Sequence, residues 1–256
     1  MANLFDRYGI KEVADVTFYK INDNEEMGAP VLYLDTLKVS TIEQTAENAE
    51  ARGGKGNAAL ISWDFGKEIT VTLEDALYSP KSLALIYGDE NATPDVLTKE
   101  QGKNLIKKTL WRKTAGALTI NGKIVTAMLN GKQVKLEGCA FYAADGEPLA
   151  EGTVTNESAN WEYVTGSMDV AAGALKIDVS ANTFPGVYYV TGDTYARNEA
   201  TGKDEFFQFI IPKAKVMSES NTITMEAEGD PTVFTMNLKV LRPRDGVMMK
   251  LVQYTV

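Results

Sequence analysis

Residues 60–73, LISWDFGKEITVTL, carry the pattern that decides the fold. In the second half of this stretch Ile69, Val71 and Leu73 alternate with polar residues. Alternation with a period of two is typical of an antiparallel strand that has one buried face and one wet face. A second run, residues 60–64, precedes Phe65-Gly66-Lys67, so the stretch predicts a β-hairpin that turns at residues 65–67.

The same alternation recurs along most of the chain. Further strands are predicted at residues 13–20, 31–42, 175–179, 187–191, 206–211, 222–227, 234–241 and 247–254. Two-residue turns are predicted at Asn121-Gly122 and Asn130-Gly131, because Asn-Gly between alternating apolar residues is a strong hairpin signal. Residues 43–57, EQTAENAEARGGKGN, are too polar for a core element and are interpreted as a loop.

Helix is scarce. Ser79 followed by Pro80 is a helix start signal and predicts a short helix that ends at Gly88. Residues 98–111 predict a second helix, although Gly102 weakens it. The fold class is therefore mainly β: an antiparallel β-sandwich or barrel with one or two short helices. Residues 1–256 are expected to form a single β domain, in which the more polar residues 145–174 form an inserted lobe or an elaborated loop.

Composition argues against several classes of function. The 256 residues contain no histidine, which removes the commonest general base and the commonest zinc ligand, so an enzyme is not expected. Cys139 is the only cysteine, so no intrachain disulfide can form, and its apolar neighbours favour a buried thiol. With 26 Lys and Arg against 35 Asp and Glu, the net charge is −9, which disfavours tight binding to DNA phosphates. No export signal and no membrane span is expected, which points to folding in a reducing cytoplasm.

Several residue patterns suggest a functional site, but for each of them an ordinary structural role is favoured. Gly53 to Asn57 suggests a phosphate loop, but Lys55 is followed by Gly56 where a Walker motif has Ser or Thr. Carboxylates near strand ends could form a glycosidase pair, yet sequence cannot test their spacing; they are Asp64, Glu74, Asp75, Glu226, Glu228 and Asp230. The last three, with Gly229, lack the pattern of a calcium loop and suggest a solvated turn.

The aromatic residues leave two alternatives. A sugar-stacking platform would need them exposed, whereas aromatic residues are buried by default; the residues concerned are Trp63, Trp111, Trp161, Tyr188 and Tyr189. Packing in the core is favoured. No catalytic, metal or cofactor-binding residue is therefore predicted, and no cofactor is expected.

Two groups of segments resemble virion structural proteins of tailed phages, most of all major tail tube subunits. The first is ARGGKGN (51–57), continuing through LISWDFGKEI (60–69) to LEDAL (73–77). The second is FQFIIPKA (207–214), followed by MEAEGDP (225–231) and LRP (241–243). The resemblance implies a β-sandwich or barrel core with a short helix, and subunits that form hexameric rings stacked into a tube.

On this resemblance the polar loop becomes the candidate ring-stacking element, through residues Arg52, Gly53, Gly54, Lys55, Gly56 and Asn57. The polar face of the predicted hairpin would line the channel, through Glu68, Thr70, Thr72 and Glu74. An acidic lumen would repel DNA phosphates, so that the genome slides through during ejection. Deleting residues 45–56 should then leave a folded monomer that forms no tube.

The expected partners are copies of the chain itself, other tail proteins and DNA in transit, with no membrane; the expected location is the virion tail, after synthesis in the host cytoplasm. Rival interpretations remain. Within the virion they are a tail terminator, a baseplate hub or a capsid decoration protein, which share related β folds. Outside it the rival is a carbohydrate-binding β-sandwich that uses exposed aromatic residues.

Overall fold

The structure is a computed structural model of the chain and describes residues 6–88, 93–156, 160–219, 223 and 233–255. The chain divides into two compact units. Unit 1 comprises residues 1–94 and 177–256, and unit 2 comprises residues 95–176. The single domain expected from the sequence stays a prediction, as does the lobe at 145–174, whose residues all lie in unit 2.

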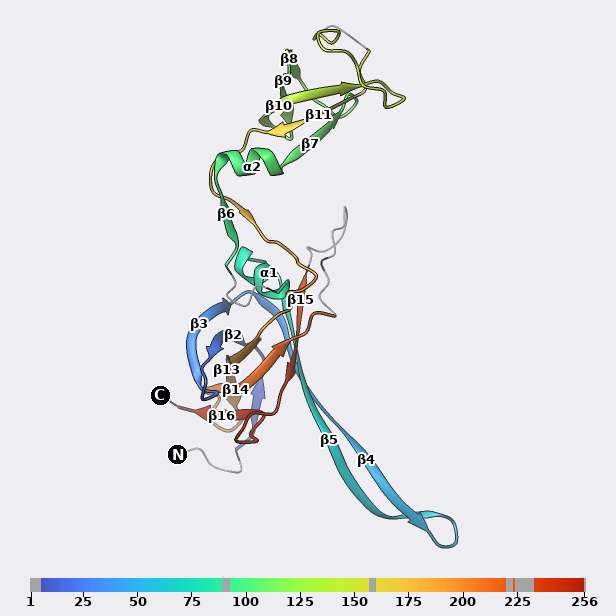
Figure 1. Cartoon of the computed structure of the whole chain (residues 1–256). Coiled ribbons are helices and arrows are strands. Elements are labelled where there is room, and N and C mark those ends of the chain that lie inside the picture. The colour runs from blue at the N-terminus through green and yellow to red at the C-terminus, as the bar shows by residue number, and fades with distance from the viewer. Residues whose placement is uncertain (1–5, 89–92, 157–159, 220–222, 224–232, 256) are drawn as a thin grey trace. The chain divides into compact units, whose positions relative to one another are not determined.

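Unit 1 is built on one nine-stranded antiparallel sheet (Figure 1). The strand order is β3-β2-β13-β14-β15-β5-β4, with β1 paired to β13 and β16 paired to β14. The strands are β1 (Tyr8–Ile10), β2 (Asp15–Ile21), β3 (Met27–Leu34), β4 (Leu37–Gly53), β5 (Ala58–Asp75), β13 (Val187–Asn198), β14 (Asp204–Val216), β15 (Phe234–Val240) and β16 (Lys250–Tyr254).

One core lies on the inner face of this sheet. Val16, Phe18, Val71, Val190 and Leu238 are completely buried in it, and residues from β2, β3, β4, β5, β13, β14 and β15 all contribute. Each fully buried side chain of this size stabilises the fold by roughly 1.5–3 kcal/mol. The described strands do not close into a barrel, since β3 and β4 end the sheet. The mainly β, antiparallel prediction is confirmed, in its sandwich form.

Helix α1 (Pro80–Ile86) covers part of that core with Leu85 and Ile86. It begins as the sequence predicts, because the Ser79 side chain accepts a hydrogen bond from the Ser82 backbone N–H in a capping box. Gly88 follows the helix at a φ of 105°. A side chain there would come within 2.9 Å of the Thr183 carbonyl oxygen, so only glycine fits.

The hairpin that dominates unit 1 differs from the predicted one. β4 and β5 pair from Leu37–Asp75 to Gly53–Ala58, and the turn lies at residues 54–57, where Gly54, Gly56 and Asn57 have positive φ. The predicted turn at residues 65–67 is therefore wrong, and so is the predicted loop over residues 43–53. The single strand predicted at 31–42 is also wrong, because the chain breaks between β3 and β4.

Unit 2 contains a five-stranded antiparallel sheet in the order β7-β11-β10-β9-β8. Its strands are β7 (Lys107–Trp111), β8 (Leu118–Asn121), β9 (Ile124–Leu129), β10 (Lys132–Tyr142) and β11 (Tyr163–Met168). The first and last strands of the unit, β6 (Asp95–Leu97) and β12 (Ala174–Lys176), pair with each other. The core consists of Leu110, Val125, Ala127, Leu136, Cys139, Phe141, Trp161 and Val164. The Asn130-Gly131 turn is confirmed, with both residues at positive φ.

Helix α2 (Lys99–Leu105) is shorter than the helix predicted at 98–111. Thr98 caps it, but the chain becomes strand β7 from Lys107, so the second half of that prediction is wrong. Gly102 is buried, and an added Cβ would lie 2.6 Å from a methyl carbon of Val170. This glycine is therefore required by packing.

The strand predicted at 222–227 lies almost entirely outside the described residues. Among the residues that the structure does describe, no helix is long and apolar enough to cross a membrane.

Candidate assembly surfaces

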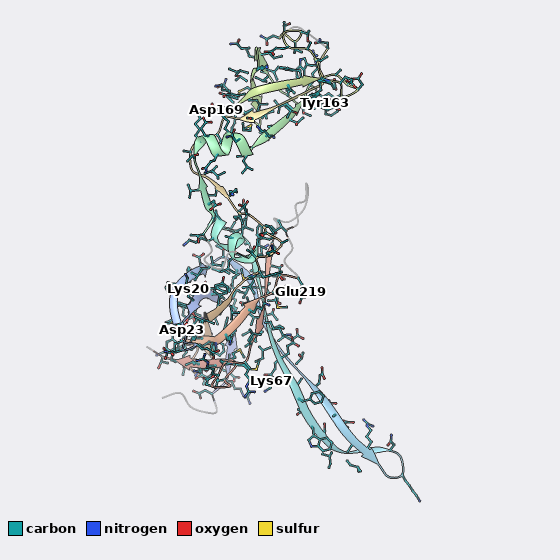
Figure 2. The ribbon with its side chains drawn as sticks, viewed as in Figure 1. Lys20, Asp23, Lys67, Tyr163, Asp169 and Glu219 are labelled. Atoms are coloured by element: carbon teal, nitrogen blue, oxygen red, sulfur yellow. The ribbon has the colours of Figure 1, made fainter. Side chains whose placement is uncertain are left out.

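The distal part of the β4–β5 hairpin extends beyond the rest of the sheet (Figures 1 and 2). β5 pairs with β15 only from Thr70 to Asp75, whereas it pairs with β4 along its whole length. Residues 46–67, here called the arm, therefore form a two-stranded ribbon, to which the described residues add no third strand. Lys67 marks the base of the arm in Figure 2.

Gly66 sets which way the arm side chains face. Thr45 lies opposite Glu68, and Glu47 lies opposite Phe65, so one residue of β4 faces both Gly66 and Lys67. This is a β-bulge with glycine in the left-handed region, at a φ of 62°. Because the bulge adds one residue, the odd-numbered positions of β5 change sides there, from the core face to the outer face.

The consequence is an exposed apolar row on the arm. Ile61, Trp63 and Phe65 share one face and are 53%, 54% and 50% exposed. Their cross-strand neighbours on that face are Ala51, Ala49 and Glu47. The opposite face is polar and pairs Asn48 with Asp64 and Glu50 with Ser62. An isolated two-stranded hairpin is marginal in water, and this one exposes an apolar face of the kind that is typical of interaction sites.

The six residues predicted as a ring-stacking loop form the tip of this arm. Arg52 and Gly53 end β4, and residues 54–57 make the turn. Arg52 forms an ion pair of 2.5 Å with Glu50. The structure thus gathers all six at one end of a protruding element, while their role in stacking stays a prediction.

The predicted lumen residues also lie together. Glu68, Thr70, Thr72 and Glu74 occupy the outer face of β5, directly opposite the buried Ile69, Val71 and Leu73. All four are half-buried, and two of them have polar partners: the Thr72 hydroxyl donates to Asn237 Oδ1 over 2.9 Å, and Glu68 forms an ion pair with Lys239. The polar face exists as predicted, and its orientation toward a channel stays a prediction.

The preference for buried aromatic residues is right for some of them and wrong for others. Trp161 and Tyr188 are buried, at 4% and 2% exposure. Trp63 on the arm and Trp111 on β7 are exposed, so the core prediction is wrong for both. They belong to different units, so the structure does not place the two on one continuous sheet surface.

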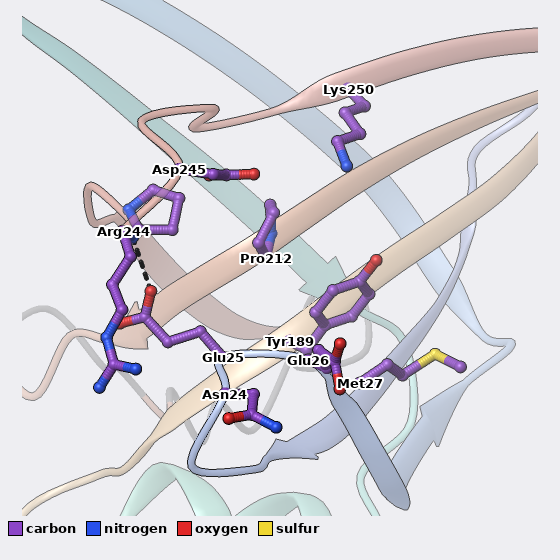
Figure 3. A pocket seen from close by; sticks show the side chains of 10 residues that line it. Asn24, Glu25, Glu26, Met27, Tyr189, Pro212, Arg244, Asp245 and Lys250 are labelled. Carbon is purple, nitrogen blue, oxygen red and sulfur yellow. Dashed lines mark hydrogen bonds between the residues drawn. The ribbon is translucent and has the colours of Figure 1, made fainter.

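A cavity of about 300 Å³ lies beside the β2–β3 turn (Figure 3). Glu25, at a φ of 63°, accepts hydrogen bonds from Lys213 Nζ over 2.7 Å and from the Arg244 backbone N–H over 2.6 Å. These bonds hold the pKa of Glu25 below its ordinary value. These contacts hold the segment before β16 against the rest of unit 1, so their role is structural.

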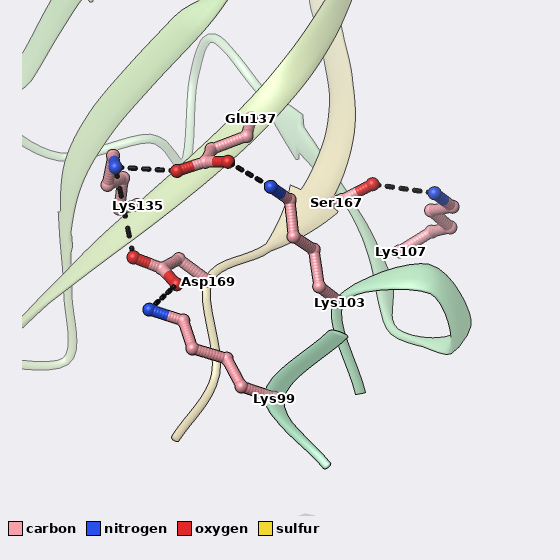
Figure 4. Close-up of polar contacts among 7 residues, drawn as sticks. All are labelled: Lys99, Lys103, Lys107, Lys135, Glu137, Ser167 and Asp169. Carbon is pink, nitrogen blue, oxygen red and sulfur yellow. Dashed lines mark hydrogen bonds and ion pairs between the residues drawn. The ribbon is translucent and has the colours of Figure 1, made fainter. Parts of the chain in front are cut away.

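Unit 2 contains a cluster of ion pairs that joins α2 to its sheet (Figure 4). The Glu137 carboxylate contacts Lys103 and Lys135, and Asp169 contacts Lys99 and Lys135. Hydrogen bonds from Lys103, which has the larger effect, and from Lys135 lower the pKa of Glu137 from 4.5 to about 2. Both carboxylates are paired with lysines of the same chain, so the cluster does not require a ligand.

Two further candidates from the sequence are a thiol and an acidic group. Cys139 is buried, as predicted, and burial raises the pKa of its thiol to about 11. The acidic group Glu226, Glu228 and Asp230, with Gly229, lies outside the described residues.

A sequence model of the YomU/Tube protein family matches residues 8–253, which include both units and the whole arm. No curated protein sequence matches the chain.

Proposed function

The chain belongs to the YomU/Tube protein family, and from this we propose that it is a structural subunit that self-assembles into the tail tube of a phage. The family description supports a structural protein of phage origin, which agrees with the resemblance found in the sequence. The finer elements of the proposal are stacked hexameric rings, a channel for DNA and a place in the virion tail.

The arm is the observation that carries the proposal. Among the described residues no third strand of the sheet covers its exposed apolar row, and contact with water is unfavourable for three large apolar side chains on a marginal hairpin. A second copy of the chain can cover the row. Pairing between copies would also satisfy the open edges of β3 and β4, which would otherwise be free to aggregate.

The distribution of charge supports a channel that does not retain DNA. Unit 2 carries ten Lys and Arg against nine Asp and Glu, which leaves 16 against 26 in unit 1. The excess of negative charge therefore lies in the unit that carries the polar face of β5. A negative lumen wall repels phosphates, so DNA would slide past it.

The test is a variant that lacks the arm but keeps both strands paired. Because Thr45 lies opposite Glu68, replacing residues 46–67 by Asn-Gly should give a tight two-residue hairpin. A deletion of residues 45–56 alone would leave half of β5 without its partner strand and is a poorer design. We expect a folded monomer that forms no tubes in negative-stain electron microscopy, beside wild-type protein that does.

A matched control keeps the arm and its tip and changes only one residue of the polar face, by Asn48→Ser. Tubes should form from this control, because the apolar row is unchanged. Tubes of normal length from the armless variant would contradict the proposal.

A further inference from the structure

Exposed apolar side chains flank helix α1 at both of its ends. Leu77, Tyr78 and Phe184, here called the α1 patch, are 64%, 57% and 64% exposed. Leu77 and Tyr78 directly precede the helix, and Tyr78 packs its ring 4.9 Å from that of Phe234. Phe184 lies at the other end, since a side chain on Gly88 would come within 3.2 Å of the Phe184 backbone N.

The arm cannot cover this patch in its own subunit. The apolar row and the α1 patch lie toward opposite ends of the continuous strand β5. Trp63 is in the arm, and Asp75 is the last residue of β5, just before the patch. At about 3.3 Å per residue, the strand separates Trp63 from Asp75 by on the order of 40 Å. Figure 1 shows the arm and α1 at opposite ends of unit 1.

We propose that the arm row of one copy, Ile61, Trp63 and Phe65, docks on the α1 patch of a second copy. This inference rests on the proposed function and names the two surfaces of the contact. Each surface is apolar, and each lacks cover among the described residues of its own unit, so docking removes both from water. The polar face of the arm, with Ser62 and Asp64, remains available to water or to polar neighbours.

The geometry of such a contact determines the kind of assembly. Two different surfaces meet, so the contact is heterologous, and the copy that receives an arm still has its own arm free. Heterologous contacts that do not close into a ring grow without limit along one direction. If the contact does not close, arm-to-patch docking gives a polar stack, in which every subunit has the same orientation.

The experiment uses two full-length variants. Trp63→Glu places a charge in the arm row, and Tyr78→Glu places one in the α1 patch; both positions are more than half exposed, so each monomer should fold. Each variant should raise the protein concentration needed for assembly on the order of thirtyfold, as expected for a central interface residue. The controls Ser62→Lys on the polar face of the arm, opposite Glu50, and Lys81→Glu on the exposed side of α1 should assemble like wild type.

Mixing the two variants gives the decisive readout. The intact arm of the Tyr78→Glu protein can dock on the intact patch of the Trp63→Glu protein, but growth then stops. Analytical ultracentrifugation should show complexes that end after one arm-to-patch contact, where each variant alone shows none.

The outcomes separate the two hypotheses. If the Tyr78→Glu protein assembles like wild type while the Trp63→Glu protein does not, the α1 patch is the wrong acceptor and the arm keeps its proposed function. If both variants assemble like wild type, the apolar row has no part in assembly and the proposed function of the arm falls with the inference.

Discussion

Strand β5 has two halves that share one sequence pattern and have opposite surroundings. In the half nearest α1, Ile69, Val71 and Leu73 alternate with polar residues and are at most 4% exposed. In the arm half, Ile61, Trp63 and Phe65 alternate with polar residues and are at least 50% exposed. The first half has a third strand beside it and a core beneath it, whereas the part of the chain that the structure describes places neither against the second half.

The difference shows what period-two alternation means. It indicates that one face of a strand will be buried, but not whether the covering atoms come from the same chain. Where the chain supplies them, the apolar face contributes to the stability of the monomer. Where it does not, the same pattern leaves an exposed apolar face, which we propose is covered by a second copy of the chain.

The largest expected effect is a difference between the two halves of β5 in how much they contribute to the free energy of unfolding. Leu73→Ala should lower the free energy of unfolding by about 2–5 kcal/mol, because it leaves a cavity in the core. Ile61→Ala removes a side chain of the same size from the arm and should change monomer stability by less than about 0.5 kcal/mol. Urea unfolding at a concentration below that of assembly measures both, and equal losses would remove the distinction.

A medium effect tests the bulge that joins the halves. Gly66→Ala forces an alanine into the left-handed region, at a cost of about 1–2 kcal/mol confined to the arm. Hydrogen exchange should accelerate in residues 46–65 and stay unchanged at Ile69–Leu73. The control is Gly53→Ala, since Gly53 has no positive φ and a Cβ there would make an ordinary 3.4 Å contact with Leu60. Unaltered exchange in the Gly66→Ala arm would show that the bulge is not needed to hold it.

The smallest expected effect concerns unit 2, where both carboxylates of the ion-pair cluster are paired with lysines of the same chain. The pKa of Glu137 is lowered on folding, from 4.5 to about 2, so its contribution to stability is present above pH 4.5 and is lost as the pH falls toward 2. Glu137→Gln should lower the melting temperature of unit 2 slightly at pH 7 and not at pH 2. The pairs are partly exposed, so 1 M NaCl should reduce the difference.

The exposed carboxylate Glu147, outside the cluster, provides the control for that prediction. Glu147→Gln should leave the melting temperature unchanged at either pH. A loss of equal size in both variants would mean that net charge, and not the ion pairs around Glu137, is responsible.

Local chemistry made part of the fold predictable. Ser79-Pro80 and Asn130-Gly131 impose specific backbone geometry, and the structure shows the expected cap and turn at those positions. The alternation at Ile69, Val71 and Leu73 likewise identified the buried face of β5 and the polar face opposite it.

The sequence does not predict the arm, because the described residues place no core against it that would require an alternating pattern in both strands. Residues 43–53 are polar, which is typical of a loop, although a strand paired on one side and open on the other tolerates the same composition. Gly66 suggested a turn because the same left-handed geometry serves turns and bulges. The residue type of Trp63 favours a position in the core. The polar composition of its partner strand, β4, is the signal in the sequence that this part of β5 is exposed.

Hydrogen–deuterium exchange of the monomer and of the assembled protein tests the central claim most directly. On assembly, amides of residues 46–67 should gain strong protection, together with residues 77–78 and 184, while Ile69 to Leu73 should be protected in both states. Arm amides that exchange as fast in the assembled protein as in the monomer would contradict the account.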